Sequence, residues 1–163
     1  MTITNLKPFI AGNWKMNGSI TEARELVQSI HRALSESPPD AEIVIIPPLT
    51  AIGALKDLIG NSSFKLGAQN VFWEDRGAYT GEVSPPMLKD AGCEYIIIGH
   101  SERRQYFGET DATVNKKIRA SLSHGLTPIM CIGETLEERE KEKTIETVER
   151  QIVEGLTDIA LKN

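Results

Sequence analysis

The 163-residue sequence is poor in several kinds of residue, and each shortage excludes a class of protein. Its two cysteines, Cys93 and Cys131, are too few for a disulfide-stapled scaffold, and both lie in apolar segments that suit buried, reduced thiols. No apolar run approaches the roughly 20 residues that a membrane-spanning helix needs. The start of the chain lacks the regions of a signal peptide. We therefore expect a cytoplasmic location.

Charge and histidine are also scarce. The 18 basic residues against 23 acidic ones leave a net charge of −5, which argues against nucleic acid or a membrane as partner. His31, His100 and His124 are scattered and the two cysteines lack ligand spacing, so we expect no metal and no cofactor. The remaining composition, 40% hydrophobic and 25% charged, is typical of a globular protein and predicts a single domain over residues 1–163.

Short apolar runs alternate with amphipathic segments along the chain. The apolar runs are nearly continuous, which predicts parallel strands covered on both faces. The predicted strands are residues 8–13, 42–46, 64–69, 95–98 and 128–132. The predicted helices are residues 19–35, 50–59, a segment opening at Ser84 and Pro85, 111–124 and 135–161, where Gly155 allows a break. Capping boxes mark two of the helix starts, Ser19 with Glu22 and Thr135 with Glu138.

This alternation of strand and helix predicts a parallel α/β sheet. Right-handed connections leave two architectures, an open doubly wound sheet or a (β/α) barrel of eight units and about 250 residues. Spacing alone does not choose between them. In both, the functional residues belong at the carboxyl ends of the strands.

Polar side chains follow three of the predicted strands directly. Residues 11–17 read AGNWKMN, residues 99–104 read GHSERR and residues 131–134 read CIGE. At such a position Lys15 can hold a phosphate or a developing negative charge. His100 can move a proton or donate a hydrogen bond to an oxyanion. Taken singly, each is more often a surface charge or a structural histidine, so the indication lies in their combination.

These strand ends resemble motifs of the triosephosphate isomerase family. Residues 11–17 are similar to its first-strand signature, and residues 98–104 are similar to its fourth-strand signature. Further similar motifs follow in the family's order at residues 47–48, 67–70, 77–82 and 131–134. The resemblance runs from about Phe9 to the end of the chain.

The resemblance implies a TIM-barrel fold, here an incomplete, open barrel of five β/α units. It implies interconversion of dihydroxyacetone phosphate and glyceraldehyde 3-phosphate, a step of glycolysis and gluconeogenesis, without metal or organic cofactor. Asn13 and Lys15 would bind substrate, and Lys15 would stabilise anionic charge. His100, the second catalytic residue, would be a neutral imidazole at a helix start that polarises the carbonyl.

The resemblance also implies supporting roles. Ser101 would be a polar contact, Glu102 would orient Lys15, and Cys131 would line the pocket. The family dimerises through the loop that follows its third strand, here about residues 70–82. This assigns Gln69, Asn70 and Thr80 to a dimer contact, with Thr80 as the inserted tip.

One part of the family pattern has no counterpart. The family's base is a glutamate after the sixth strand, in a segment like Ala-Tyr-Glu-Pro-Val-Trp, and these 163 residues contain no such segment. The lid and the glycine-rich phosphate loops are missing as well. We therefore expect a truncated chain with negligible activity, which binds a triose phosphate or another small anion weakly at best.

Five strands cannot close an eight-stranded barrel, so we also expect homo-oligomers formed through the barrel edges and the loop of residues 70–82. Two alternatives remain. One is a non-catalytic, self-associating scaffold. The other is a doubly wound binding module, which would need a glycine-rich phosphate loop where residues 12–15 read GNWK.

Overall fold

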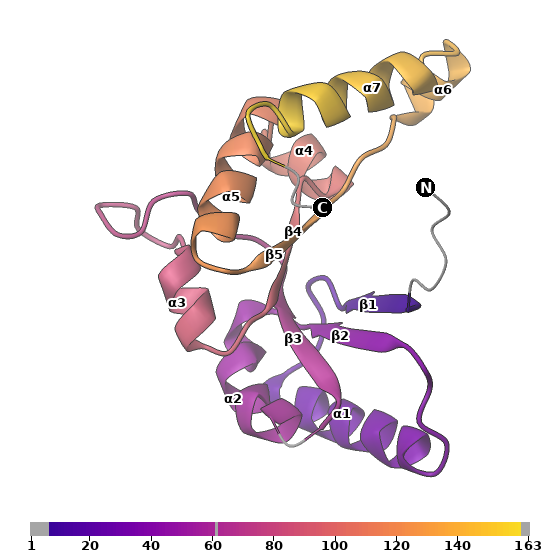
Figure 1. The fold of residues 1–163 in the computed structure, drawn as a ribbon, viewed down its shortest axis with the longest axis vertical. Coiled ribbons are helices and arrows are strands. Elements are labelled where there is room, and N and C mark those ends of the chain that lie inside the picture. Colours follow the sequence, from indigo (N-terminus) through magenta and orange to yellow (C-terminus); the bar gives the residue numbers. More distant parts are fainter. Residues whose placement is uncertain (1–6, 61, 161–163) are drawn as a thin grey trace. The chain divides into compact units, whose positions relative to one another are not determined.

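The computed structural model describes residues 7–60 and 62–160, in which each strand is followed by one or two helices (Figure 1). The strands are β1 (Phe9–Asn13), β2 (Glu42–Ile46), β3 (Phe64–Ala68), β4 (Tyr95–Ile98) and β5 (Thr127–Met130). The helices are α1 (Ile20–Ser35), α2 (Leu49–Gly60), α3 (Pro85–Asp90), α4 (Ser101–Phe107), α5 (Asp111–Ser123), α6 (Leu136–Glu140) and α7 (Thr144–Gly155). All five predicted strands are confirmed, with ends that differ by at most two residues.

Both predicted capping boxes are present. Ser19 precedes α1, where its hydroxyl accepts the backbone N–H of Glu22 and its own N–H donates to the Glu22 carboxylate at 2.7 Å. Thr135 and Glu138 repeat this arrangement at the start of α6, with a distance of 2.8 Å from Thr135 N to the carboxylate. Each box satisfies amides that have no partner inside the helix.

The single helix expected over residues 135–161 is wrong. The segment forms two helices, because Glu142 adopts a left-handed backbone with a φ of 57° and ends the run that α6 began. Gly155, where a break was expected, is the last residue of α7. The predicted end at Leu161 lies outside the described residues. The sequence analysis also gave only a helical turn near Ser101, where the structure has the two-turn helix α4.

The chain divides into two compact units. The first unit holds the chain up to Gln69 together with Met87–Tyr95, and the second holds Asn70–Pro86 and the chain from Ile96 onward. The single domain expected over residues 1–163 stays a prediction.

Within the first unit, β2 pairs in parallel with both β1 and β3. Within the second unit, Cys131 N donates to Ile98 O at 2.8 Å and joins the chain after β5 to the end of β4. The strand order is β1-β2-β3-β4-β5, which is the order of the chain. A doubly wound sheet reverses its order at a switch point, so this topology is that of an incomplete (β/α) barrel with five units.

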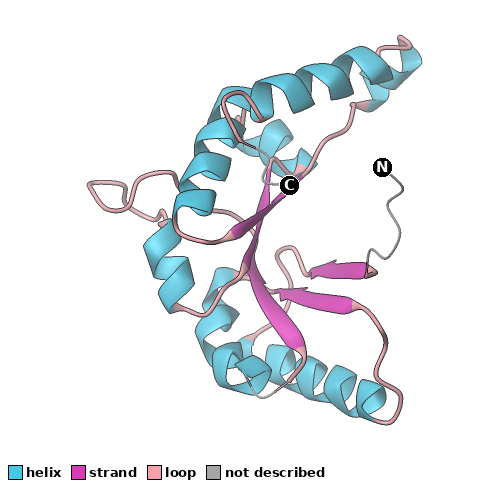
Figure 2. Ribbon diagram, in the orientation of Figure 1, coloured by secondary structure: helices cyan, strands magenta, loops and turns pink. Residues whose placement is uncertain are grey.

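The apolar strand runs are explained by burial on both faces. All three isoleucines at the end of β4 are at most 4% exposed, and so are the last three residues of β2. Helices cover one face of the strands in each unit, as Figure 2 shows. In the first unit the buried helix residues include Val27 and Leu55, and in the second they include Val114 and Ile118.

The strand β1 departs from this pattern. Phe9 and Ile10 are 45% and 55% exposed, and β1 stands at one end of the strand order. The strand at this end of the order therefore leaves apolar surface uncovered at these two residues. No helix in residues 7–60 and 62–160 has the length and apolar character to cross a membrane.

Neither cysteine forms a disulfide. Cys93 is buried, and burial raises the pKa of its thiol to about 12. Cys131 is only partly buried, so the expectation of two buried thiols holds fully for Cys93 alone.

Candidate functional site

The turn that follows β1 is fixed by side-chain amides. Asn13 Oδ1 accepts the backbone N–H of Lys15 at 2.9 Å, and Asn17 Nδ2 donates to Trp14 O at 2.9 Å. Gln69, which the sequence analysis assigned to a dimer contact, donates from Nε2 to Lys15 O at 2.8 Å and to Ile46 O at 3.2 Å. The peptide groups on both sides of the Lys15 Cα atom are therefore held.

This hold matters because Lys15 has a left-handed backbone with a φ of 53°. A residue with a Cβ atom loses about 1–2 kcal/mol in that conformation, and glycine loses almost none. Strain of this kind persists where the surrounding structure over-determines the backbone, and it concentrates at functional sites. A strained lysine at the carboxyl end of a strand therefore supports the interpretation that its ammonium group is functional.

His100 sits between β4 and α4. Gly99, with a φ of 77°, turns the chain out of the strand, and His100 then forms the N-cap of α4. Its Nδ1 accepts the backbone N–H of Glu102 at 3.3 Å. A ring nitrogen that accepts a hydrogen bond carries no proton, so this contact favours the tautomer with the proton on Nε2, while the Glu102 carboxylate, whose Oε2 lies 3.5 Å from the same Nδ1, favours a proton on Nδ1. The expected helix start at the histidine ring is confirmed.

A buried ionic cluster lies behind this turn. Glu109 Oε1 accepts the backbone N–H of Gly99 at 2.9 Å, while its Oε2 accepts Arg103 Nε at 2.8 Å and Lys117 Nζ at 3.0 Å. Lys117 Nζ also donates to Asn70 Oδ1 at 2.7 Å. Glu109 is 8% exposed and Lys117 is 4% exposed. Asn70, expected at a dimer contact, therefore begins its loop with a hydrogen bond to this cluster.

Arg104 holds the other side of the same turn. Its Nε donates to Gly99 O at 2.8 Å, one terminal nitrogen donates to Asp111 at 2.5 Å, and the other donates to Cys131 O at 3.4 Å. A Cβ atom on Gly99 would lie only 3.0 Å from the Arg104 guanidinium and from Val114. Glycine is therefore required here by space as well as by its backbone angle.

Charge keeps Glu109 ionised. Burial by itself raises the pKa of its carboxyl, but the Lys117 charge and the hydrogen bonds from Lys117, Arg103 and the Gly99 amide together bring that pKa below its ordinary value of 4.5. Burial lowers the pKa of Lys117 by more than the attraction of Glu109 raises it.

The predicted site residues fall into two groups. Asn13, Lys15 and Gln69 lie in the first unit, and the other six, Asn70, Thr80, His100, Ser101, Glu102 and Cys131, lie in the second. The expected contact of Glu102 with Lys15 joins the two units and stays a prediction. Thr80 lies in an exposed turn of its loop, and its dimer role also stays a prediction.

Sequence reasoning missed the buried pair of Glu109 and Lys117 and the ion pair of Asp111 with Arg104. One signal was available, because Lys117 falls on the same helical stripe as the buried residues Val114 and Ile118. A lysine on a buried stripe needs an acidic partner.

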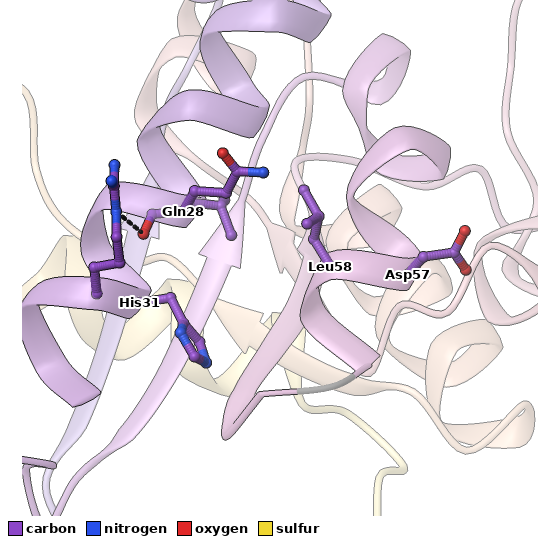
Figure 3. A pocket seen from close by; sticks show the side chains of 6 residues that line it. Gln28, His31, Asp57 and Leu58 are labelled. Atoms are coloured by element: carbon purple, nitrogen blue, oxygen red, sulfur yellow. Dashed lines mark hydrogen bonds between the residues drawn. The ribbon is translucent and has the colours of Figure 1, made fainter.

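A pocket between α1 and α2 lies apart from all of these residues (Figure 3). His31 and Asp57 are among the side chains that line it, and the His31 ring meets the Phe64 ring edge-on at 5.9 Å. This contact suits a structural histidine. Within residues 7–60 and 62–160, no group of three or more His, Cys, Asp or Glu side chains is placed to hold a metal ion.

Comparison with known proteins gives a consistent family. The family model described as triosephosphate isomerase matches residues 8–163. The triosephosphate isomerase of Moorella thermoacetica is 57% identical over 150 residues, which cover 92% of this chain and 59% of that protein. That of Trichodesmium erythraeum is 48% identical over 157 residues, which cover 96% of this chain and 65% of that protein.

A solved structure is similar as well. The crystal structure of triosephosphate isomerase from Bartonella henselae has a TM-score of 0.84 and 42% identity, covering 95% of this chain and 64% of that chain. This chain thus spans 59–65% of the length of the two curated relatives named above.

We expect Lys15→Gly to be more stable than Lys15→Ala by about 1 kcal/mol, because glycine adopts the left-handed backbone at residue 15 without strain. Urea unfolding of the two variants measures the difference. The same pair of substitutions at Lys116, inside α5, is the control, and there glycine is expected to be the less stable by about 1 kcal/mol. Equal stabilities at residue 15 would contradict the strain at this turn.

We expect Glu109→Gln to remove part of the chain's sensitivity to acid. Because the folded-state pKa of Glu109 is lowered, its ionisation stabilises the fold above the unfolded-state value near 4.5, and this stabilisation is lost as the pH falls through the folded-state pKa. Urea unfolding from about pH 7 to about pH 3 should show a smaller loss of stability in the variant than in the parent. The control Glu94→Gln removes a half-exposed carboxylate that pairs with Lys65, and it should follow the parent curve. Parallel curves for Glu109→Gln and the parent would refute the expectation.

Proposed function

The chain belongs to the triosephosphate isomerase family, and from this premise we propose that its strand ends form part of a site that interconverts dihydroxyacetone phosphate and glyceraldehyde 3-phosphate. The observation that carries the proposal is the hydrogen bond from Glu102 N to His100 Nδ1. With Nδ1 accepting this bond, the proton of the ring lies on Nε2, where it can be donated to a ligand.

The reaction moves hydrogen between two adjacent carbons. A base removes a proton from the carbon that bears the hydroxyl, the electrons of that C–H bond form a carbon–carbon double bond, and the carbonyl electron pair moves onto its oxygen. The Nε2–H of His100 donates a hydrogen bond to that oxygen as its charge develops. The former carbonyl oxygen then gains a proton while the neighbouring hydroxyl oxygen loses one, and return of the base's proton to the other carbon completes the exchange of hydroxyl and carbonyl.

Lys15 supplies positive charge. Its ammonium stabilises the anionic substrate and intermediate, as a point charge on a flexible stem does for phosphate. The backbone from which that stem extends is fixed by Asn13 and Gln69, so the entropy of positioning is lowered before substrate binds. Asn13 contributes a substrate contact next to the lysine. Ser101, Glu102 and Cys131 support the site from the second unit.

The base is not among the residues that we assign. These 163 residues contain no segment like Ala-Tyr-Glu-Pro-Val-Trp, and a general base contributes about 10²–10⁴-fold to a reaction. We therefore propose that the 163-residue chain tested alone has negligible isomerase activity. A cytoplasmic location, supported by the family and by the two unpaired thiols, is part of the same proposal.

A fusion tests the assigned residues. The chain is joined after residue 163 to the part of the Moorella thermoacetica protein that lies beyond the match, in a host without its own isomerase. We expect the fusion to interconvert the two triose phosphates, the unfused chain to be at least about 100-fold slower, and His100→Gln in the fusion to lower kcat by about 100-fold or more.

The control for this test is His31→Gln, which changes a histidine in the pocket between α1 and α2 and should leave kcat within about twofold. An active fusion in which His100→Gln and His31→Gln behave alike would refute the role of His100. Turnover by the unfused chain at the rate of the fusion would refute its proposed inactivity.

We propose that the chain forms homo-oligomers, and β1 gives the physical reason. Its exposed Phe9 and Ile10 lie on the strand at one end of the strand order, where apolar surface and an unpaired backbone edge invite another chain. The loop of residues 70–82, with Thr80 at its turn, is the second contact that we propose. A non-catalytic scaffold would self-associate in the same way. Lys15 and His100, which match the family's catalytic motifs, do not favour a non-catalytic scaffold.

Light scattering on the 163-residue chain tests this proposal. We expect a species larger than a monomer that Ile10→Lys shifts toward the monomer, because the added charge lies on the exposed face of β1. Ile145→Lys on α7, at a residue that is 70% exposed, is the control and should leave the assembly unchanged. A parent chain that is monomeric at all concentrations would refute self-association.

A further inference from the structure

The peptide groups of Gly99 are held from two directions. The N–H donates to Glu109 Oε1 at 2.9 Å, and the carbonyl oxygen accepts from Arg104 Nε at 2.8 Å. Gly99 is the single residue between the buried end of β4 and His100. Glycine has more backbone freedom than any other residue. Without these two hydrogen bonds, the backbone dihedral angles of Gly99 could vary and the position of His100 would vary with them.

Glu109 is also bonded to the helix that His100 caps. Its Oε2 accepts Arg103 Nε at 2.8 Å, and Arg103 lies in the first turn of α4, where its own N–H donates to His100 O at 2.8 Å. One carboxylate therefore fixes the residue before His100 and the helical turn after it. These are the two segments that decide whether Glu102 N can reach the His100 ring.

Glu109 pairs with a second cation, Lys117, and this explains why residue 109 must carry a carboxylate. Glu109 Oε2 receives Lys117 Nζ at 3.0 Å as well as Arg103, and both Glu109 and Lys117 are less than 10% exposed. An amide at residue 109 would present its NH2 group either to the Gly99 N–H or to both cations. It could not keep the Gly99 amide, Arg103 and Lys117 together, whereas a carboxylate accepts all three.

We propose that Glu109 is a positioning residue for His100. Through the Gly99 peptide and Arg103 it holds the start of α4 so that Glu102 N donates to Nδ1 and the proton of the imidazole stays on Nε2. The proposal deepens the proposed function and rests on it for its catalytic meaning. Its geometric content concerns this chain alone and can be tested without turnover.

The test is nuclear magnetic resonance of the ¹⁵N-labelled 163-residue chain near neutral pH, with hydrogen exchange of its amides. In Glu109→Gln we expect the Glu102 and Gly99 amides to exchange about tenfold faster than in the parent, while the amides of Val114 and Ile118 in the α5 core change much less. The His100 Nδ1 resonance should move away from its parent position, because it loses a hydrogen-bond donor.

Two further variants make the result decisive. The double variant Glu109→Gln/Lys117→Gln removes both charges together, so no buried charge stays unpaired if the single variant fails to fold. Glu94→Gln is the matched control, because it makes the same carboxylate-to-amide change at the exposed pair with Lys65, and it should leave the Glu102 and Gly99 amides unchanged.

A merely structural role predicts a different pattern. In that case the Glu102 amide and the α5 core amides would accelerate by the same factor, and the His100 Nδ1 resonance of the folded protein would keep its position. Either that pattern or unchanged Glu102 protection in both variants would overturn the proposal. A fusion enzyme without activity would count against the proposed function and would leave this result as it stands.

Discussion

The carboxylate of Glu109 receives a backbone amide from Gly99 and two cationic side chains, those of Arg103 and Lys117, in a nearly dry environment. The free-energy cost of removing such a carboxylate from water is offset only when its hydrogen bonds and ion pairs are formed. Removing one partner of a buried ion pair destabilises a fold by on the order of 3–5 kcal/mol. The end of β4, the first turn of α4 and the start of the loop at Asn70 all meet at this cluster. Its geometry therefore decides where His100 lies within the second unit.

The two strand ends that bear the candidate residues share one construction. In each, the chain leaves a strand through a left-handed backbone, at Lys15 in the first unit and at Gly99 in the second. In each, a side chain from later in the sequence holds the peptide of that residue, an amide from Gln69 in one case and the carboxylate of Glu109 in the other. The strand fixes where the candidate residue lies, and one side chain that is distant in sequence fixes the orientation of the peptide at the strand end.

Much of this could be predicted from the sequence, because local rules decide it. The isoleucines of β4 form a continuous apolar run, the capping boxes at Ser19 and Thr135 use neighbouring residues, and the polar motifs follow their strands directly. The resemblance of those motifs then gave the family and the topology. Each of these signals lies within a few residues of the element that it specifies.

The rest depends on partners that are distant in sequence. Lys117 meets Asn70 across 47 residues and Gln69 meets Lys15 across 54, and no periodicity encodes either pairing. The break between α6 and α7 falls at Glu142, which has neither glycine nor proline to announce it. Gln69 was read from its motif as a dimer residue, while its hydrogen bonds within the first unit could come only from the structure.

The span from Lys15 to Gln69 has a consequence for the order in which the chain is made. A polypeptide that emerges from the ribosome with its amino end first can form β1 and α1 early, but the clamp on the Lys15 carbonyl waits until the end of the third strand has been released. The turn at Gly99 waits only ten residues for Glu109. The turn at Lys15 is thus synthesised well before its partner, and it reaches its final conformation only after Gln69, 54 residues later, has left the ribosome.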